Sequence, residues 1–356
     1  MRIAYIINSV EGGGAALPVP AVTDVLRRGG AQVRVLALTR RDGRAIASME
    51  AAGLDVLVRE GGEKDHAAAL AWLDRQIATI QPTHLWTSLS RATLLGQLAG
   101  LRRRLPVVSW QHAAYLKPAN RRLLRATQQL SRLWVGDSDA VTRLTAERLK
   151  VPAERLAQWS IFRADPEAPR ARPWHPGETL RIGTLGRLHR VKGYDVLIEA
   201  LARLPASGMP IDVSIAGDGA QRENLEESAR ALGVTTLRLQ GYTQDPRAYL
   251  AGLHLYLQPS RSEGLCVAAH EAMQAGLPVV ASAVGQLPYS ITAGRTGALV
   301  PPGNAEALAA ALADMVAEPQ RLEVMGAAAR SDVLDRFSAE RFEAAGLAIL
   351  DRMRRF

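Results

Sequence analysis

The stretch LHLYLQPSRSEGLCVAAHEAMQAGLPVVAS, residues 253–282, decides the fold. Its first part, 253–260, is short and apolar and reaches a proline near its end, which predicts a buried strand. The part from 267 to 275 has the composition of a helix, and Gly276 and Pro278 after it predict where the helix ends. The apolar run that follows predicts a second strand. A strand, a helix and a second strand in this order form a βαβ unit, so we expect a parallel sheet.

Two glutamates in this stretch are placed to bind a ligand. Glu263 lies in the loop before the predicted helix, and Glu271 lies about two turns along it. The amino end of a helix at the carboxyl edge of a parallel sheet is where such folds bind phosphate-bearing ligands. We therefore predict that both carboxylates contact one ligand there.

The composition is that of a globular protein with room for two domains. The chain has 356 residues, of which 47% are hydrophobic, so burying a core is no difficulty. Its single cysteine, Cys266, excludes a disulfide framework and a zinc site built of cysteines, and it fits a reducing compartment. The apolar run at the amino end is too short for a signal peptide, and no run approaches the about 20 apolar residues of a membrane-spanning helix. We expect a soluble, cytoplasmic protein.

The formal net charge of +9 is carried by the first half of the chain. Residues 1–150 contain 22 Lys and Arg against 12 Asp and Glu, a net +10, whereas the remainder contains 22 against 23, a net −1. A basic half indicates a polyanionic partner, which can be a nucleic acid, an anionic membrane surface or a phosphorylated substrate.

Short apolar runs alternate with longer helical patterns along both halves. In the first half the apolar runs lie at 2–8, 32–39, 54–60, 83–89, 105–112 and 132–138. In the second half they lie at 180–186, 211–219, 236–242, 253–260 and 278–284. This alternation predicts an α/β protein made of two doubly wound, Rossmann-like domains that face each other across a cleft.

A stretch rich in proline and charge separates the two halves. We place an amino-terminal domain at 1–165, a linker at 166–178 and a carboxyl-terminal domain at 179–337. The last segment, 338–356, is predicted to be an amphipathic helix with a basic end. It could cap the second domain or cross back to the first, and the sequence leaves both placements open.

The first strand of the second half ends in a loop that suits a diphosphate. Gly183 and Gly186 allow tight backbone turns, and Arg187 and Lys192 lie in the loop before the next helix. Two cations beside a helix N-terminus fit a diphosphate group, although the same pattern occurs in solvated basic loops.

Glycines also end the next two strands of this half. Gly217 and Gly219 would allow close approach of a ligand, and they occur as often in ordinary strand-to-helix turns. Gly241 and Tyr242 end the following strand, where backbone groups could contact a nucleotide base.

In order and spacing, these features resemble the nucleotide-sugar half of GT-B glycosyltransferases, specifically the large retaining family four, also called group 1. The resemblance covers residues 180–310. The matching motifs are Gly186-Arg187 with Lys192-Gly193, Ala216–Gly219, Pro259-Ser260, Glu263–Leu265, Glu271–Met273 and Gly276–Pro278. It implies a GT-B fold and a metal-independent hexosyltransferase. The implied reaction moves a sugar from a nucleoside diphosphate to an acceptor hydroxyl with retained configuration, in cell-surface polysaccharide, lipopolysaccharide or glycolipid synthesis.

The resemblance assigns roles to the residues of the donor half. Glu271 is similar to the family's ribose ligand, and Glu263 to the glutamate near the hydroxyls of the donor sugar. Ser260 is a candidate phosphate ligand, and Arg187 and Lys192 would neutralise the leaving diphosphate in place of a metal. The remaining donor-binding positions that it implies are Gly14, Gly186, Gly217, Gly241, Tyr242 and the backbone amides of Gly264, Leu265 and Cys266.

The first half matches the family more weakly, as expected of an acceptor-binding domain. A glycine loop after the first strand contains Gly13 and Gly14, and it is not the G-x-G-x-x-G of dinucleotide-binding proteins because Leu17 follows. His112, just beyond a strand, is similar to a histidine that contacts the transferred sugar and the acceptor; a buried structural histidine is the alternative. Gly13 and Ser138 are further acceptor-binding candidates.

The implied catalytic residues are therefore Glu263, His112, Arg187 and Lys192. Asp137 and Asp139 mimic a metal motif, but they precede a helix and are typical of N-cap residues, so no metal or other cofactor is expected.

Two positions depart from the family's pattern. Cys266 stands where the family often has glycine, and the segment WSIFRADP, 159–166, replaces the family's Asn-Gly-Val-Asp turn, so contacts from that turn are not carried over.

Two other functions fit parts of the sequence. A non-hydrolysing nucleotide-sugar epimerase has the same architecture, and it would act on the donor without an acceptor. A basic nucleic-acid-binding protein is less favoured, because aromatic residues make up only 5% of the chain and no nucleic-acid motif is present.

The acceptor is expected to be a saccharide or a lipid-linked molecule. A predicted helix at 120–132 carries Arg121, Arg122, Arg125 and Arg132, and Arg102–Arg104 form a second basic cluster. We hypothesise that this face rests on the anionic inner surface of the plasma membrane; the alternative is a helix packed on its own sheet with a solvated arginine face.

Overall fold

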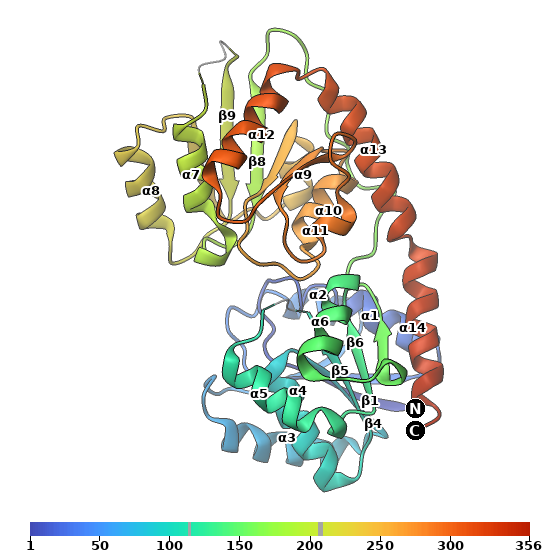
Figure 1. Cartoon of the computed structure of the whole chain (residues 1–356). Helices are drawn as coiled ribbons and strands as arrows, with labels where there is room; N and C mark the ends of the chain where they lie inside the picture. Colours follow the sequence, from blue (N-terminus) through green and yellow to red (C-terminus); the bar gives the residue numbers. More distant parts are fainter. Residues whose placement is uncertain (113–114, 206–208) are drawn as a thin grey trace. The chain divides into compact units, whose positions relative to one another are not determined.

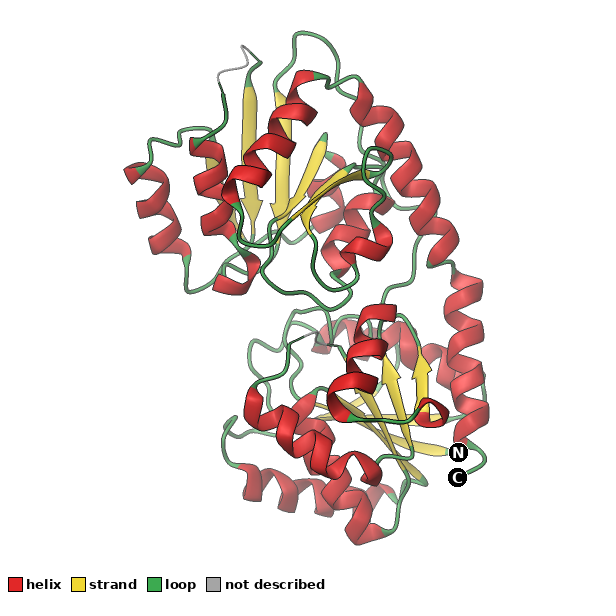
Figure 2. Cartoon of the chain, in the orientation of Figure 1, coloured by secondary structure: helices red, strands yellow, loops and turns green. Residues whose placement is uncertain are grey.

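The computed structural model describes residues 1–112, 115–205 and 209–356. The chain forms two compact units. Unit 1 contains Met1–Phe162 and Glu340–Phe356, and unit 2 contains Arg163–Ala339 (Figure 1). Each unit has a parallel sheet as its middle layer and helices on both faces (Figure 2).

Unit 1 is built on a seven-stranded parallel sheet in the order β3-β2-β1-β4-β5-β6-β7. Its strands are β1 Arg2–Ile7, β2 Gln32–Ala37, β3 Asp55–Val58, β4 His84–Ser88, β5 Val107–Gln111, β6 Leu133–Gly136 and β7 Leu156–Gln158. The central strands β4, β5 and β6 are buried along their whole length, because helices cover both faces of the sheet.

The helices of unit 1 form two layers. On one face α3, α4, α5 and α6 lie in a row, and on the other face α1 packs against α2 and α14. Their bounds are α1 Val19–Arg28, α2 Ile46–Ala51, α3 His66–Ile80, α4 Ser90–Arg103, α5 Pro118–Thr127, α6 Asp139–Leu149 and α14 Ala339–Met353.

The last helix, α14, belongs to unit 1. Its Phe342 packs on Trp159 with ring centroids 5.3 Å apart, and the Met353 carbonyl contacts His84 Nε2 at 3.0 Å. The Arg352 side chain donates to the Leu156 carbonyl at 2.6 Å. The carboxyl-terminal segment therefore returns to the amino-terminal sheet, which is one of the two placements left open by the sequence.

Unit 2 is built on a six-stranded parallel sheet in the order β10-β9-β8-β11-β12-β13. Its strands are β8 Leu180–Leu185, β9 Ile211–Ala216, β10 Leu237–Gly241, β11 Leu255–Gln258, β12 Val279–Ser282 and β13 Gly297–Val300. Its helices are α7 Tyr194–Ala202, α8 Arg222–Ala231, α9 Pro246–Ala251, α10 Val267–Gln274, α11 Leu287–Ser290, α12 Ala305–Ala317 and α13 Arg321–Arg336.

The helices of unit 2 also lie on both faces of its sheet. α7 packs between α8 and α12 on one face, and α10 packs between α9 and α13 on the other. With both sheets parallel and doubly wound, the predicted α/β class with two Rossmann-like halves is confirmed.

The segment 166–178, expected to be a linker, is part of unit 2 and packs on its helices. The buried Arg330 on α13 donates hydrogen bonds to the carbonyls of Gln274, at the end of α10, and of Pro166. Ala171 N also donates to the Ala275 carbonyl at 2.7 Å. Because these backbone groups are satisfied by α10 and α13, the segment follows a fixed path along unit 2.

Within the described ranges, no helix is long and apolar enough to cross a membrane.

Candidate functional site

The loop after β8 brings a lysine to the carboxyl edge of the unit 2 sheet. A 3₁₀ turn spans Arg190–Lys192, and Gly193 follows it at φ +67° as the residue before α7. A side chain at Gly193 would come within 2.1 Å of the Pro259 carbonyl, so the loop after β8 and the loop after β11 touch only because this position is glycine.

Glu263, in the loop after β11, is the centre of a cluster of donors. Its Oε1 atom accepts hydrogen bonds from Lys192 Nζ at 2.8 Å, from Ser260 Oγ at 2.6 Å and from Gln258 Nε2 at 3.1 Å. The side chains of Lys192 and Glu263 are 22% and 10% exposed. A partly buried ion pair with added hydrogen bonds holds both charged groups in one geometry.

The environment keeps Lys192 charged. Burial lowers the pKa of its amine, but the Glu263 carboxylate outweighs burial and raises the pKa above its ordinary value. A cation is therefore fixed at the edge of the sheet. Arg187, at the start of the same loop, is exposed to solvent.

The ends of β8, β9 and β10 converge beside this cluster. A side chain at Gly217 would come within 1.9 Å of the Gly186 carbonyl, and Gly217 N donates to the Gly241 carbonyl at 2.7 Å. Glycine at position 217 thus lets three strand ends approach one another. Tyr242, directly after β10, is 53% exposed.

The turn before α10 presents unused backbone donors. In the part of the chain that the structure describes, the amides of Gly264, Leu265 and Cys266 donate to no protein group. These amides precede the amino end of α10, where the aligned peptide dipoles also favour a negative ligand. The turn is suited to hold a phosphate or a sugar oxygen.

Cys266 adopts the left-handed conformation, with φ +67° and ψ +68°. Glycine adopts this conformation without strain, which agrees with the glycine that the family resemblance implies at this position. The side chain is buried, and burial, helped by the Glu263 carboxylate, raises the pKa of the thiol far above its usual range. Cys266 is therefore a neutral thiol packed beside Glu263.

The conformation of Cys266 leads to a stability prediction. We expect the Cys266→Gly variant to unfold at a higher temperature than Cys266→Ala, because both lose the thiol and only alanine keeps a Cβ in the left-handed region. The expected difference is about 1 kcal/mol, or roughly 2–4 °C in a thermal melt. Equal melting temperatures for the two variants would show that this turn is not strained.

Glu271 lies on α10 with its side chain half-buried. Burial raises the pKa of its carboxyl to about 7, and Arg247 lowers it only partly. Arg247 itself forms an ion pair with Asp165 at 2.7 Å. Among the described residues no hydrogen bond or ion pair to the Glu271 carboxylate is formed, so it is free to accept from a ligand.

In unit 1 the predicted histidine lies at the carboxyl ends of β4, β5 and β6. His112 Nε2 is 2.7 Å from Ser88 Oγ, its Nδ1 is 3.5 Å from Asp137 Oδ2, and its ring packs on Trp110 with centroids 5.0 Å apart. The nearby Asp137 carboxylate favours a proton on Nδ1, which leaves Nε2 to accept from the Ser88 hydroxyl. Both ring nitrogens of His112 thus face protein groups.

Ser138 is the N-cap of α6. Its Oγ accepts from Val141 N at 3.2 Å and donates to Asp137 Oδ1 at 3.0 Å, and the residue is 2% exposed. Asp139 is the first residue of α6. The cap is therefore the serine rather than either aspartate, and the serine hydroxyl predicted to meet an acceptor is already engaged within the protein.

The glycine loop after β1 contains Gly13 and Gly14. Its backbone is folded on itself, with Ala16 N and Leu17 N both donating to the Gly13 carbonyl at 3.1 Å. Gly12 N donates to Asp42 Oδ1 at 2.9 Å. Gly14 is exposed.

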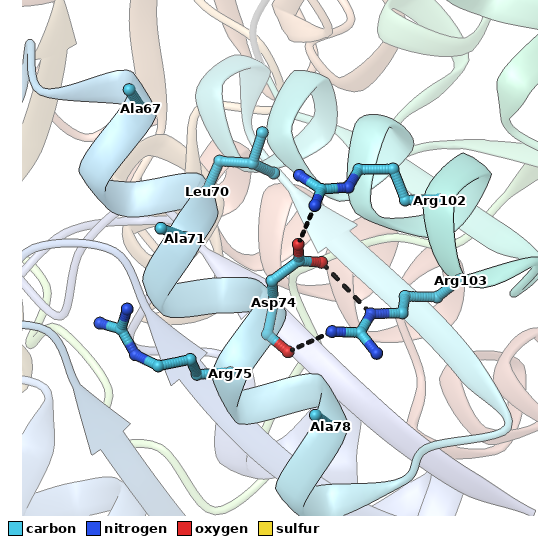
Figure 3. Close-up of a pocket in the computed structure, with 8 residues that line it drawn as sticks. All are labelled: Ala67, Leu70, Ala71, Asp74, Arg75, Ala78, Arg102 and Arg103. Carbon is cyan, nitrogen blue, oxygen red and sulfur yellow. Dashed lines mark hydrogen bonds and ion pairs between the residues drawn. The ribbon is translucent and has the colours of Figure 1, made fainter.

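A basic groove lies between α3 and α4 of unit 1 (Figure 3). It encloses 550 Å³. Asp74 Oδ2 pairs with Arg102 at 2.9 Å and Asp74 Oδ1 with Arg103 at 3.4 Å, while Arg75 points away from them (Figure 3). Its floor is formed by small apolar residues, Ala67, Leu70, Ala71 and Ala78.

Three residues of these clusters were missed from the sequence. Gln258 and Tyr256 support Glu263 from β11, and Ser88 contacts His112 from β4. For Gln258 and Ser88 the available signal was a polar side chain at the carboxyl end of a largely apolar strand.

Comparison with known proteins identifies the family. The family described as glycosyl transferases group 1 matches residues 167–332. A D-inositol 3-phosphate glycosyltransferase of Rhodococcus opacus (strain B4) is 30% identical over 365 residues, covering 89% of this chain and 81% of that protein. The chain belongs to the group 1 glycosyl transferases. The family resemblance found in the sequence is thus confirmed.

This glycosyltransferase is also similar to a second relative in sequence and to a solved structure in fold. It is 30% identical over 176 residues to a lipopolysaccharide core biosynthesis glycosyltransferase, LpsE, of Rhizobium meliloti (strain 1021). That match covers 49% of this chain and 51% of the relative, so the chain spans about half of that protein's length. The Anabaena protein HepE, solved with UDP and glucose, has the same fold, with a TM-score of 0.85 at 19% identity over 100% of both chains.

Proposed function

We propose that this glycosyltransferase moves a sugar from a nucleoside diphosphate to an acceptor hydroxyl and retains the anomeric configuration. The proposal rests on one arrangement of side chains and backbone. Glu263 accepts hydrogen bonds from Lys192 and Ser260, and the free amides of 264–266 follow it directly in the chain. A fixed cation, a fixed carboxylate and a helix N-terminus together fit a sugar attached to a diphosphate. The relative crystallised with UDP and glucose supports the same donor class.

Different residues of unit 2 would contact different parts of the donor. Glu271 would accept hydrogen bonds from the ribose hydroxyls, and Glu263 from the hydroxyls of the sugar. Lys192 and Arg187 would contact the diphosphate, and the ends of β9 and β10 would lie beside the base. Of these groups, Lys192 and Glu263 are already joined before a ligand arrives.

The chemical step separates charge. The bond between the anomeric carbon and the diphosphate oxygen breaks, and negative charge builds on the leaving group. Lys192, Arg187 and the turn before α10 stabilise that charge. The acceptor oxygen then bonds to the anomeric carbon on the same face, and its proton passes to the leaving phosphate oxygen, so the configuration is retained without a protein nucleophile.

Transfer is expected to need no metal ion. In the described residues no three His, Cys, Asp or Glu side chains are grouped to hold one, and Asp137 is already engaged by Ser138. We expect EDTA to leave the transfer rate unchanged, as measured by release of the nucleoside diphosphate. A loss of activity that Mg²⁺ or Mn²⁺ restores would return Asp137 and Asp139 to consideration as ligands.

Unit 1 is proposed to take the acceptor, with His112 as its catalytic side chain. Two relatives act in lipopolysaccharide core and inositol phosphate chemistry by name, which supports a saccharide or a lipid-linked acceptor in cell-surface synthesis. The basic surface of this unit suits an anionic membrane. Arg121, Arg122 and Arg125 on α5 are exposed, as are Leu98 and Leu101 on α4.

We expect unit 1 to bind anionic membranes reversibly. Each arginine near such a surface contributes about 1 kcal/mol, and the exposed Leu123, which follows Arg122 on α5, adds apolar contact. Co-sedimentation at low salt should therefore be stronger with vesicles of phosphatidylcholine and phosphatidylglycerol than with phosphatidylcholine alone. Arg122→Glu should weaken it, and Arg203→Glu, at the residue that follows α7 in unit 2, should not. If binding depends on neither the lipid charge nor the salt concentration, the result would favour the alternative interpretation, a soluble acceptor and a solvated arginine face.

The donor class is tested by binding. Calorimetric titration with UDP-, GDP- and ADP-sugars should show one nucleotide family bound far more tightly than the others. Incubation with that donor alone then distinguishes transfer from epimerisation, because an epimerase would convert the sugar without an acceptor. Absence of binding to every nucleotide sugar would contradict the proposal.

A further inference from the structure

Strand β11 carries two polar side chains inside the core of unit 2. Tyr256 and Gln258 are two positions apart, so they point to the same face of the sheet. Both are 0% exposed. The residues between and before them, Leu255 and Leu257, are also fully buried. Polar groups in such a place are stable only when they are hydrogen-bonded.

The two side chains form a continuous chain of hydrogen bonds. Tyr256 OH accepts from Leu185 N at 3.2 Å and donates to Gln258 Oε1 at 3.0 Å. The Gln258 amide then donates to Ser260 Oγ at 2.8 Å and to Glu263 Oε1 at 3.1 Å. The chain begins at the last residue of β8 and ends at the carboxylate after β11.

This chain joins two different loops. Leu185 directly precedes Gly186 and Arg187 in the loop after β8, which also carries Lys192. Ser260 and Glu263 belong to the loop after β11. On the surface the loops are joined by the Lys192–Glu263 ion pair, and below it they are joined by Tyr256 and Gln258.

The direction of the hydrogen bonds fixes the amide of Gln258. Its Oε1 faces a hydroxyl that can donate, and its Nε2 faces a carboxylate, which only accepts. Nε2 has two hydrogens, and they are directed to Ser260 Oγ and Glu263 Oε1. No flipped orientation satisfies the carboxylate, so Glu263 is held in one position.

We propose that Gln258 and Tyr256 are positioning residues for the donor sugar, because they hold Glu263 and Ser260 in a fixed place relative to the diphosphate loop after β8. Neither side chain touches the donor. This inference rests on the proposed function, since it takes Glu263 as the ligand of the sugar. It predicts that the two residues affect recognition of the sugar more than recognition of the nucleotide.

The test compares a nucleotide sugar with the nucleoside diphosphate that lacks the sugar. The probes are UDP-glucose with UDP, GDP-mannose with GDP, and ADP-glucose with ADP, and the pair that the unaltered protein binds is titrated calorimetrically into the full chain. We expect Gln258→Leu, which keeps the size and removes both donors, to weaken binding of the nucleotide sugar at least tenfold. Binding of the nucleoside diphosphate should change less than threefold. Tyr256→Phe should move the same ratio about threefold.

Tyr249→Phe is the matched control. The Tyr249 hydroxyl also forms hydrogen bonds with the sheet, at 3.1 Å from the Thr184 carbonyl and 2.9 Å from Ser214 Oγ. It has no hydrogen bond with Gln258 or Glu263. Tyr249 lies on α9, and its replacement by Phe deletes the same hydroxyl from a position packed against the same sheet. We expect it to lower the melting temperature and to leave the ratio of the two affinities unchanged.

Each outcome decides the inference. If Gln258→Leu weakens both probes equally, or neither, Gln258 has only a structural role and the proposal is wrong. If Gln258→Leu does not fold, Tyr256→Phe decides, and an effect on the ratio no larger than that of Tyr249→Phe overturns the proposal. If the unaltered protein binds none of the UDP-, GDP- and ADP-sugars, the proposed function fails first, and the inference fails with it.

Discussion

Replacing Lys192 with alanine is expected to lower the rate of sugar transfer at least tenfold while the protein stays folded. Lys192 supplies a fixed positive charge for the leaving diphosphate, and loss of a charged contact in a partly buried site costs about 2–4 kcal/mol. The same substitution removes a donor from Glu263, which keeps Ser260 and Gln258. Measurement of kcat and KM with the preferred donor checks the expectation.

The control for this prediction is Arg190→Ala. Arg190 lies in the same 3₁₀ turn and its side chain is exposed, so it tests whether general loss of positive charge in the loop is enough. We expect it to alter the rate less than threefold, a small effect of the kind seen for solvent-screened charges. Normal kinetics for Lys192→Ala, or equal losses for both variants, would remove Lys192 from the site.

The sequence was sufficient for the secondary structure that surrounds the donor site. The stretch 253–282 was expected to be a strand, a helix and a strand, and the structure has β11 Leu255–Gln258, α10 Val267–Gln274 and β12 Val279–Ser282. The reason is that buried parallel strands have nearly continuous apolar sequences, and glycine and proline mark where elements end. These local signals do not depend on distant contacts.

Residues that act through distant contacts were not predictable in this way. The contact between Ser88 and His112 joins the ends of two strands 24 positions apart in the sequence. The edge strand β7, three residues long and partly exposed, has no apolar run to reveal it. The fixed path of 166–178 depends on Arg330, more than 150 positions away. Composition suggested a linker, whereas tertiary hydrogen bonds decide its structure.

For the site residues, the local sequence predicted the type of side chain but not its contacts or its backbone conformation. The motif around Glu263 predicted a carboxylate near the sugar, but it did not predict that three donors would converge on one of its oxygens. In the same way, Cys266 was noted as a departure from glycine, and only the backbone conformation shows that the position is left-handed. Roles for these residues in binding remain predictions.

The Glu271→Gln variant is expected to be more stable than the unaltered protein at pH 8. Burial raises the pKa of Glu271 to about 7, above the 4.5 of an ordinary glutamate. The folded protein therefore binds this proton more tightly than the unfolded chain does, and its stability falls as the pH rises from 4.5 to 7. Glutamine cannot ionise, so the variant does not lose stability in this way as the pH rises. Since the side chain is only half-buried, the expected gain at pH 8 is about 2–3 kcal/mol.

The gain should disappear in acid. Below pH 4.5 the glutamate is protonated in both the folded and the unfolded protein, and the two proteins should then have nearly equal stability. Calorimetric melts at about pH 3.5, one unit below the ordinary glutamate pKa, and at pH 8 measure the difference directly. A comparison of variant with unaltered protein at each pH cancels the titration of all other groups. An equal difference at both values would show that Glu271 is not the group that titrates.

The same substitution should weaken binding of the donor. An ionised carboxylate can accept hydrogen bonds from both ribose hydroxyls, whereas an amide offers one accepting oxygen, so one hydroxyl loses its partner. Loss of a hydrogen bond to a charged group costs about 1.5–3 kcal/mol, which predicts at least a tenfold loss of affinity for the nucleoside diphosphate at pH 8. Below pH 6 the loss should shrink, because Glu271 is then mostly protonated in the unaltered protein. A variant that gained stability and kept its affinity would show that Glu271 is a buried carboxylate without a part in binding.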